Sequence, residues 1–239
     1  MWSNRDRTWI AGCALIVAVC NLHLMTNTEP TILVFDISKV VNGEWWRVIT
    51  HPFVHVSWYH LVLDCGAILL LWKEIRLRSQ KLKLLAAAIC AAASLVFSLL
   101  SSSAIHHYGL CGFSGTAHGL TFLVGLVWLS EAKRGDKKHR NLLVVCGLFF
   151  IFASGGKSLI EVFTGEVIFS DLHVGDLGIP IVESHLGGVI GGALAALVVW
   201  AMKHKPFDLT PTLTDNSNKD TTVSGGETYS NISAESEPQ

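Results

Sequence analysis

Six apolar runs dominate this chain, and they restrict it to folds whose helices lie within a membrane. The runs cover residues 8–25, 58–72, 82–101, 114–130, 141–154 and 185–202. Hydrocarbon cannot satisfy free backbone N–H and C=O groups, so each run is expected to be helical. Several runs are shorter than the roughly 20 residues of a full span. Short helices fit where a helix ends at a water-filled cavity inside the protein. We predict an all-α membrane protein, a six-transmembrane-helix bundle.

Composition supports this class and limits the alternatives. Hydrophobic residues make up 50% of the chain and charged residues 15%, and the net charge is −1. A charge so close to zero argues against a nucleic-acid partner. The first run lacks a cleavable signal pattern, so we expect it to stay as the first helix. Residues 206–239 have too few apolar side chains to form a core, and we expect a disordered cytoplasmic tail after a membrane domain of residues 1–205.

Basic residues predict the orientation. Placed on a six-helix path, most of them fall on one side: Arg5, Arg7, Lys73, Arg76, Arg78, Lys81, Lys83, Lys133, Arg134, Lys137, Lys138, Arg140, Lys203 and Lys205. The other side holds only Lys39, Arg47 and Lys157. Because basic loops stay in the cytoplasm, both termini are predicted to be cytoplasmic. On the outer side, the segment 157–184 is acidic, contains Gly and Pro, and is expected to be a flexible loop.

The segment 111–119 carries the strongest chemical signal. It is polar and glycine-rich, and it leads directly into the apolar stretch 120–129. Ser114 lies between Gly112 and Gly115 at the mouth of this helix. One interpretation is structural, because serine caps helices and glycine permits close helix packing. The other is that Ser114 is a nucleophile, which requires a neighbouring base.

Two histidines within apolar runs are candidate bases. His118 follows Ser114 by one helical turn, and His185 opens the last apolar run. A partner on the same helix is poorly directed to remove the hydroxyl proton, so we favour His185 as the base. For His118 we expect a supporting role, in which it hydrogen-bonds another helix.

Glycines indicate how the two helices meet. Gly188 and Gly192 form a small-residue face on the last helix. Gly115 and Gly119 form a matching face on the helix of Ser114. If these faces pack together, His185 reaches the level of Ser114.

The oxyanion formed during acyl transfer needs hydrogen-bond donors. The backbone N–H groups of Ser114 and Gly115 are candidates at the start of their helix. His60 and Asp64 lie four residues apart on one helix face and offer side chains. An ionised Asp64 would repel an oxyanion, whereas a protonated one could donate a hydrogen bond. Alternatively, Asp64 only orients His60 or caps a neighbouring helix, and the two interpretations have equal weight.

Taken together, four blocks resemble the rhomboid family of intramembrane serine proteases. Residues 43–50 resemble its Trp-Arg motif, which includes Arg47, and residues 55–64 resemble its His-x-x-x-Asn motif. Residues 112–115 resemble its nucleophile motif, and residues 185–192 its catalytic-histidine helix. The resemblance covers residues 8–202 and implies a six-helix core and a Ser114–His185 dyad with no third catalytic residue. Asp64 departs from the family, which usually has Asn there.

The segment 112–119 looks most like the rhombosortase branch, which reads close to Gly-Leu-Ser-Gly-x-x-His-Gly. That branch is implied to process bacterial surface proteins with a C-terminal Gly-Gly sorting signal and a short hydrophobic helix. The resemblance therefore implies a protein of the bacterial inner membrane. Its active site would open to the outer face, and its partners would be membrane-anchored substrates and the bilayer.

These observations predict a serine peptide hydrolase that needs no cofactor or metal. The alternatives are a general rhomboid protease and a non-catalytic rhomboid-like protein that binds transmembrane segments; Asp64 favours the latter. A weaker alternative assigns the 11 histidines to haem or metal binding. The six cysteines form no C-x-x-C pair and most lie in apolar runs, so disulfides and zinc sites are not expected.

Overall fold

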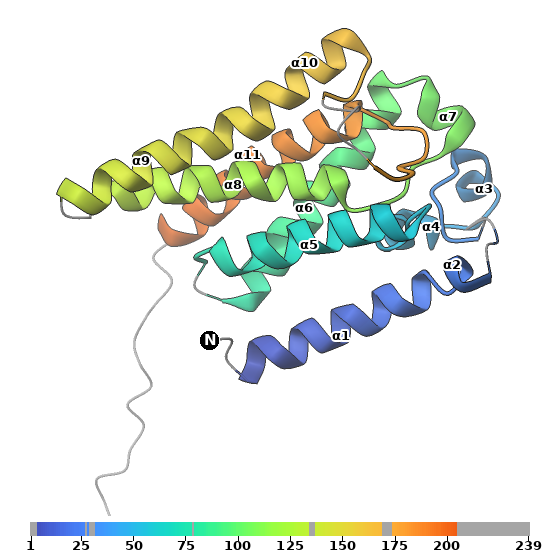
Figure 1. Ribbon diagram of the computed structural model, residues 1–239, viewed down its shortest axis with the longest axis horizontal. Coiled ribbons are helices and arrows are strands. Elements are labelled where there is room, and N and C mark those ends of the chain that lie inside the picture. The colour runs from blue at the N-terminus through green and yellow to red at the C-terminus, as the bar shows by residue number, and fades with distance from the viewer. Residues whose placement is uncertain are drawn as a thin grey trace, which may run out of the picture. The chain divides into compact units, whose positions relative to one another are not determined.

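The computed structural model describes residues 4–26, 28, 32–77, 79–133, 137–168 and 174–204. In these ranges the regular structure is helical, and an isolated antiparallel bridge joins Phe35 to Leu110. The predicted tail, residues 206–239, lies outside the described residues. Figure 1 shows the long helices running side by side, with short helices gathered near one end.

Each predicted apolar run contains a long helix. The elements in chain order are α1 Asn4–Cys20, α2 His23–Thr26, α3 Ile37–Val41, α4 Arg47–Thr50, η1 His51–Phe53, α5 Trp58–Glu74, α6 Gln80–Ser101, α7 Ala104–Tyr108, α8 Ser114–Ala132, α9 Lys137–Ile151, η2 Phe152–Gly156, α10 Lys157–Thr164 and α11 Glu183–His204. Serine caps set two of the starts, because the Ser57 and Ser79 hydroxyls accept backbone N–H groups in the first turns of α5 and α6.

Length and composition identify three helices that could cross a membrane. They are Gln80–Ser101, His139–Thr164 and Glu183–Met202 among the described residues. A fourth candidate is a broken span, Arg47–Phe53 with Trp58–Glu74, bent by 91°. The first apolar helix, Ile10–Thr26, is shorter. An all-helical membrane protein is therefore supported, whereas six spans remain a prediction.

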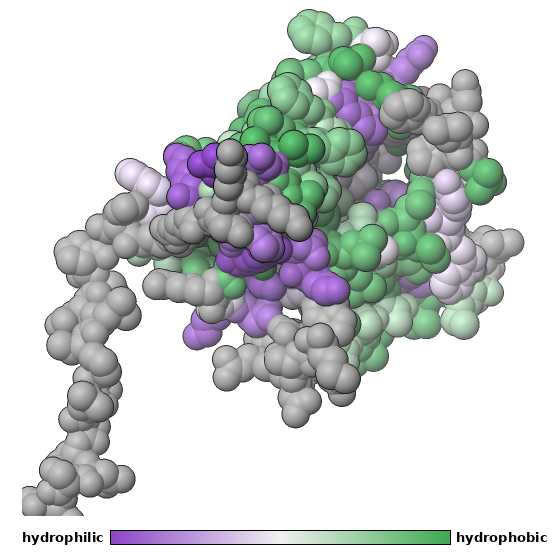
Figure 2. All heavy atoms as spheres, turned by 60° about the vertical axis from the view of Figure 1, so that its left-hand side comes forward, coloured by the Kyte–Doolittle hydropathy of each residue, from purple (hydrophilic) through white to green (hydrophobic). Residues whose placement is uncertain are grey.

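The surface of the long helices is suited to lipid. Leu100, Phe163 and Leu197 are 82%, 87% and 62% exposed. Figure 2 shows hydrophobic residues over a broad part of the visible surface. Such extensive apolar exposure is unusual for a protein surrounded by water. It indicates a membrane-integral protein.

The predicted loop of residues 157–184 is wrong for residues 157–164, which are helical, whereas the described residues 165–168 and 174–182 lie outside helices and strands. The chain continues from α9 through η2, a π-helical turn, into α10, which ends at Thr164. The predicted apolar run ends at Ser154, but Gly155 and Gly156 continue the helix as part of the π-turn. The α10 segment is amphipathic: Ser158 and Glu161 are buried, and Phe163 is exposed. The extended helix thus carries polar side chains into the bundle.

Glycine contacts join α8 to α11, as the small-residue faces predicted. A Cβ atom added at Gly188 would lie 1.8 Å from the Gly115 carbonyl oxygen. One added at Gly192 would lie 2.2 Å from the Gly119 carbonyl oxygen. No other residue type allows the backbones to approach this closely. A neighbouring edge of α11 packs on α6, where a Cβ at Gly191 would lie 2.6 Å from the Cα of Cys90.

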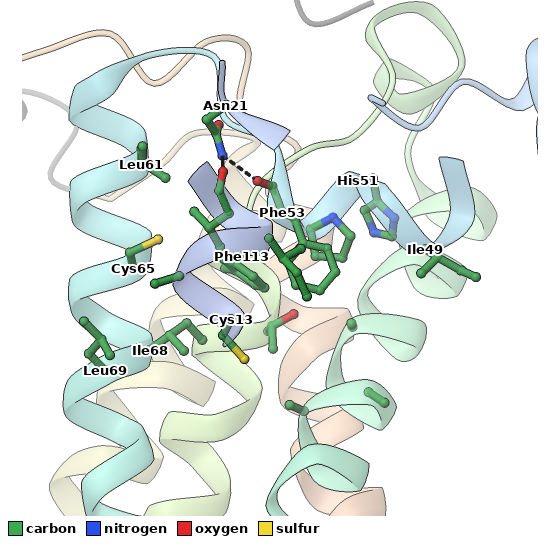
Figure 3. Close-up of a pocket in the computed structure, with 18 of the residues that line it drawn as sticks. Cys13, Asn21, Ile49, His51, Phe53, Leu61, Cys65, Ile68, Leu69 and Phe113 are labelled. Carbon is green, nitrogen blue, oxygen red and sulfur yellow. Dashed lines mark hydrogen bonds between the residues drawn. The ribbon is translucent and has the colours of Figure 1, made fainter. Parts of the chain in front are cut away.

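The first helix borders an apolar cavity rather than the glycine-lined core. This cavity, of about 1230 Å³, lies between α1 and the helices α5 and α6. Figure 3 shows Asn21 at one end of it, bonded to Phe53. The Asn21 amide donates to the Phe53 carbonyl at 2.7 Å, and its oxygen accepts the His55 N–H at 2.8 Å. These bonds hold the bent segment before α5 against α1.

Candidate active site

The turn that leads into α8 depends on Gly112. Its φ is +94°, a conformation that favours glycine. A Cβ atom there would also lie 2.7 Å from the His60 ring and 2.9 Å from Asp64 Oδ2. The turn is fixed on its other side, because the Gly112 N–H donates to the His51 carbonyl at 3.0 Å. Ser114 is consequently presented as the first residue of α8.

Asp64 holds the start of α8 as a hydrogen-bond acceptor. Its Oδ2 accepts the Phe113 N–H at 2.6 Å. The same oxygen lies 3.3 Å from His60 Nε2 and 3.4 Å from His55 Nε2. All three neighbours can donate to a carboxylate, so this geometry favours the interpretation in which Asp64 orients His60 and the adjacent turn. A role for His60 and Asp64 in binding an oxyanion remains a prediction.

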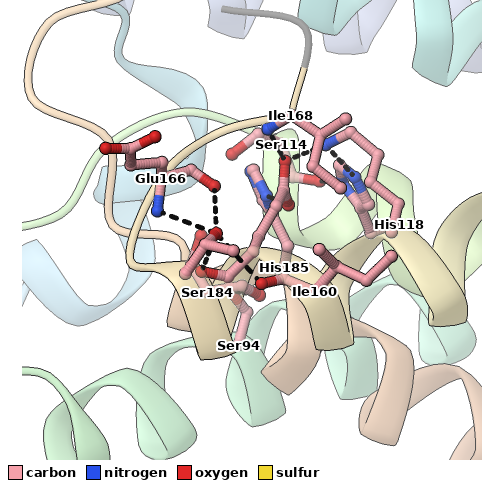
Figure 4. A network of polar contacts seen from close by, with 11 residues as sticks. Ser94, Ser114, His118, Ile160, Glu166, Ile168, Ser184 and His185 are labelled. Atoms are coloured by element: carbon pink, nitrogen blue, oxygen red, sulfur yellow. Dashed lines mark hydrogen bonds and ion pairs between the residues drawn. The ribbon is translucent and has the colours of Figure 1, made fainter.

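Ser114, His118 and His185 form one cluster (Figure 4). His118 Nδ1 donates to the Ser114 carbonyl oxygen at 2.8 Å. The His118 and His185 rings are stacked, with centroids 4.1 Å apart and planes 13° from parallel. His185 therefore lies beside the helical turn that Ser114 begins.

Backbone packing joins the same two helix starts. A Cβ at Gly115 would lie 2.6 Å from the Ser184 carbonyl oxygen, so the residue after Ser114 contacts the residue before His185. The Ser94 hydroxyl donates to that carbonyl at 2.9 Å and ties it to α6. The register between α8 and α11 is thus fixed at the level of the proposed dyad.

Sequence reasoning missed two members of this cluster, Lys157 and Glu161. His185 Nδ1 is 2.7 Å from Glu161 Oε2. Lys157 Nζ is 2.5 Å from Glu161 Oε1 and 3.3 Å from His118 Nε2. Glu161 is fully buried. The signal in the sequence was a Lys and a Glu four residues apart after an apolar run, the spacing of a helical ion pair.

The cluster also has the residue types of a metal site. Ligating atoms of His118, Glu161 and His185 lie within 4.8 Å of one another. The Lys157 ammonium, however, is bonded to Glu161 and lies beside His118. A cation would have to displace this positive charge from the carboxylate. The contacts fit a hydrogen-bonded network better than a set of metal ligands.

Arg47, in the segment that resembles the Trp-Arg motif, is buried and hydrogen-bonds neighbouring parts of the chain. Its guanidinium bonds Glu44 Oε2 at 2.8 and 2.6 Å and donates to the Val34 carbonyl at 2.8 Å. It is 4% exposed. These bonds hold the segment before α4 to the chain before α3.

Comparison with known families agrees with this arrangement. A family model described as the Rhomboid domain matches residues 42–202, which include all four blocks and the whole cluster. A comparison with solved structures found no match. The matched segment is more than half of the chain and contains the glycine-joined helices and the turn before Ser114. This chain belongs to the rhomboid family.

Proposed function

We propose that this protein is an intramembrane serine protease in which Ser114 is the nucleophile and His185 the general base. The observation that carries the proposal is the glycine contact between α8 and α11. This contact brings the starts of the two helices together. The His185 ring stacks on the ring of His118, which lies one helical turn after Ser114. Rhomboid proteins are in general serine proteases that act on membrane proteins within the bilayer.

The proposed reaction is hydrolysis of a peptide bond. As the Ser114 Oγ attacks the scissile carbonyl, His185 takes its proton, and the imidazolium later gives it to the leaving amine. Water then releases the acyl group from Ser114. The N–H groups of Ser114 and Gly115, with His60, are proposed to stabilise the oxyanion. A substrate helix must unwind to expose its carbonyls, and glycine near the cut makes unwinding easier.

The substrate class we favour is a membrane-anchored protein with a C-terminal Gly-Gly signal and a short apolar helix, as in rhombosortase processing. Support comes from the segment 112–119, in which His118 follows the nucleophile by one turn. The proposed setting is a bacterial inner membrane, with six spans, cytoplasmic termini and an outward-facing site.

A reconstitution experiment tests this proposal. The purified protein is placed in liposomes with a reporter that ends in Gly-Gly and a short apolar helix. We expect a released reporter domain, with its new end defined by mass spectrometry. A matched reporter that moves the Gly-Gly pair from the C-terminal signal into the apolar helix separates the branches. It still unwinds readily, so a general rhomboid protease should cleave it, whereas an enzyme that requires the Gly-Gly sorting signal should not. Binding without cleavage would support the non-catalytic rhomboid-like alternative and contradict the proposal.

Asp64 provides a first prediction. Asp64→Asn keeps an oxygen that can accept the Phe113 N–H, so cleavage should stay within about tenfold of wild type. Asp64→Leu removes the acceptor and leaves the part-buried Phe113 N–H unpaired, which costs about 1–3 kcal/mol and releases the turn before Ser114. The initial rate of reporter release measures both variants. Equal activity of the Leu and Asn variants would show that this acceptor is not needed.

A further inference from the structure

The strongest unassigned feature is the buried carboxylate at the proposed base. Glu161 Oε2 is 2.7 Å from His185 Nδ1, and Glu161 is fully buried. A buried carboxylate needs charged or hydrogen-bonding partners. Lys157 Nζ and the Ile168 N–H supply them on the other oxygen, at 2.5 and 3.0 Å. Figure 4 shows the labelled neighbours of this carboxylate, His118, Ile168 and His185, gathered around one network of polar contacts.

The hydrogen bonds define which nitrogen of each histidine carries a proton. An ionised Glu161 only accepts, so His185 donates from Nδ1. Neutral His185 then has an unprotonated Nε2, the form that can take a proton from a serine hydroxyl. His118 also donates from Nδ1, to the Ser114 carbonyl. Its unprotonated Nε2 can accept from Lys157.

The helix geometry holds this carboxylate in place. Lys157 and Glu161 are one turn apart on α10, directly after the π-turn η2. A π-turn rotates the residues that follow it relative to a regular α-helix. On α10, Glu161 is fully buried, whereas Ile160 is 52% exposed and Phe163 87% exposed. The carboxylate therefore comes from a third helix, separate from α8 and α11.

We infer that Glu161 is a positioning residue for His185, giving a Ser114–His185–Glu161 arrangement in place of a bare dyad. This inference rests on the proposed function. Glu161 keeps the proton of His185 on Nδ1 in the resting enzyme. When Nε2 takes the Ser114 proton, the carboxylate stabilises the imidazolium without taking a proton itself. Lys157 balances the carboxylate charge while the site is at rest.

Glu161→Gln tests the role, because it keeps the size of the side chain and removes the charge. A Gln side chain can also donate to Nδ1 and favour the wrong tautomer. We measure the reaction of Ser114 with a fluorophosphonate probe in the full-length, detergent-solubilised protein. The maximal labelling rate should fall at least about 100-fold. The probe concentration for half-maximal rate should change by less than about threefold, since binding does not involve Glu161.

Glu131→Gln is the matched control. Glu131 forms an exposed ion pair with Arg76 at the other end of α8, and its variant should label at the wild-type rate. Circular dichroism and thermal unfolding establish that each variant is folded. Wild-type labelling in a folded Glu161→Gln protein would overturn the inference but leave the proposed function standing. Failure of the wild-type protein to label would instead count against the proposed function.

A second measurement needs no variant of Glu161 and does not depend on activity. In ¹⁵N-histidine-labelled protein, NMR chemical shifts report which ring nitrogen is protonated, and a His185→Gln variant assigns the signal. We expect His185 to carry its proton on Nδ1. A proton on Nε2 at neutral pH would overturn the inference, whether or not Glu161→Gln folds. The same measurement on a folded Glu161→Gln variant adds a further readout: a purely structural role for Glu161 would leave the His185 tautomer unchanged, whereas the positioning role predicts that it changes.

Discussion

Replacing Ser114 with alanine is expected to abolish release of the reporter domain in liposomes. The substitution removes the only atom that the proposed mechanism joins covalently to substrate. Loss of a serine nucleophile typically lowers kcat by about a millionfold, so no product should be detectable. The protein should remain folded, because the contact that Ser114 makes to His118 uses its backbone carbonyl, which alanine retains. Reporter release and thermal unfolding are measured on the same preparation.

Ser130→Ala is the control for this prediction. Ser130 lies near the other end of α8, is exposed, and donates only within its own helix, to the Val127 carbonyl. Its variant should release the reporter at the wild-type rate. Reporter release by Ser114→Ala at more than a small fraction of that rate would show that another group performs the attack.

Gly188→Ala is expected to have the largest effect on stability. The added Cβ would lie 1.8 Å from the Gly115 carbonyl oxygen and 2.6 Å from its carbon. Both atoms are backbone, so no side-chain rotation relieves the clash, and α11 must move away from α8. Overpacking of this kind costs about 3 kcal/mol or more. We expect the unfolding midpoint to fall by about 10 °C. Cleavage should also drop by about 100-fold, because His185 moves with α11.

Gly66→Ala provides the comparison for Gly188→Ala. Gly66 lies in the middle of α5, and a Cβ atom there would meet nothing within 4 Å. Alanine at an unhindered helical position stabilises by about 0.4–1 kcal/mol. Thermal unfolding should therefore separate the two variants clearly. Equal midpoints would mean that α8 and α11 do not approach as closely as the structure shows.

The helices and their glycine contacts could be predicted from local patterns. Apolar runs of helical length identified the long helices, and the spacing of Gly188 and Gly192 identified the face that meets α8. These predictions succeed because burial of apolar residues and close backbone packing leave a regular trace in sequence. The number of helices that cross the membrane is harder to predict from the sequence, because apolar helices such as Ile10–Thr26 are short for a membrane span.

The network around Glu161 could not be predicted in the same way. The apolar run ends at residue 154, and the segment 157–184 is acidic and contains Gly and Pro, so sequence alone predicts a loop there. A π-turn is set by tertiary packing and has no simple sequence pattern. Without the continued helix, nothing placed Lys157 and Glu161 near His118 and His185. The role of Asp64 was equally hard to predict from the sequence, because only the fold shows that its carboxylate accepts the Phe113 N–H.

The central claim is that Ser114 reacts as a nucleophile because His185 on a neighbouring helix removes its proton. Fluorophosphonate treatment of the full-length protein in membranes, followed by peptide mass spectrometry, tests this claim most directly. We predict an adduct on Ser114 in the wild-type protein and at least about a 100-fold slower reaction in a folded His185→Ala variant. Absence of an adduct on Ser114, or equal labelling rates in the two proteins, would contradict the claim.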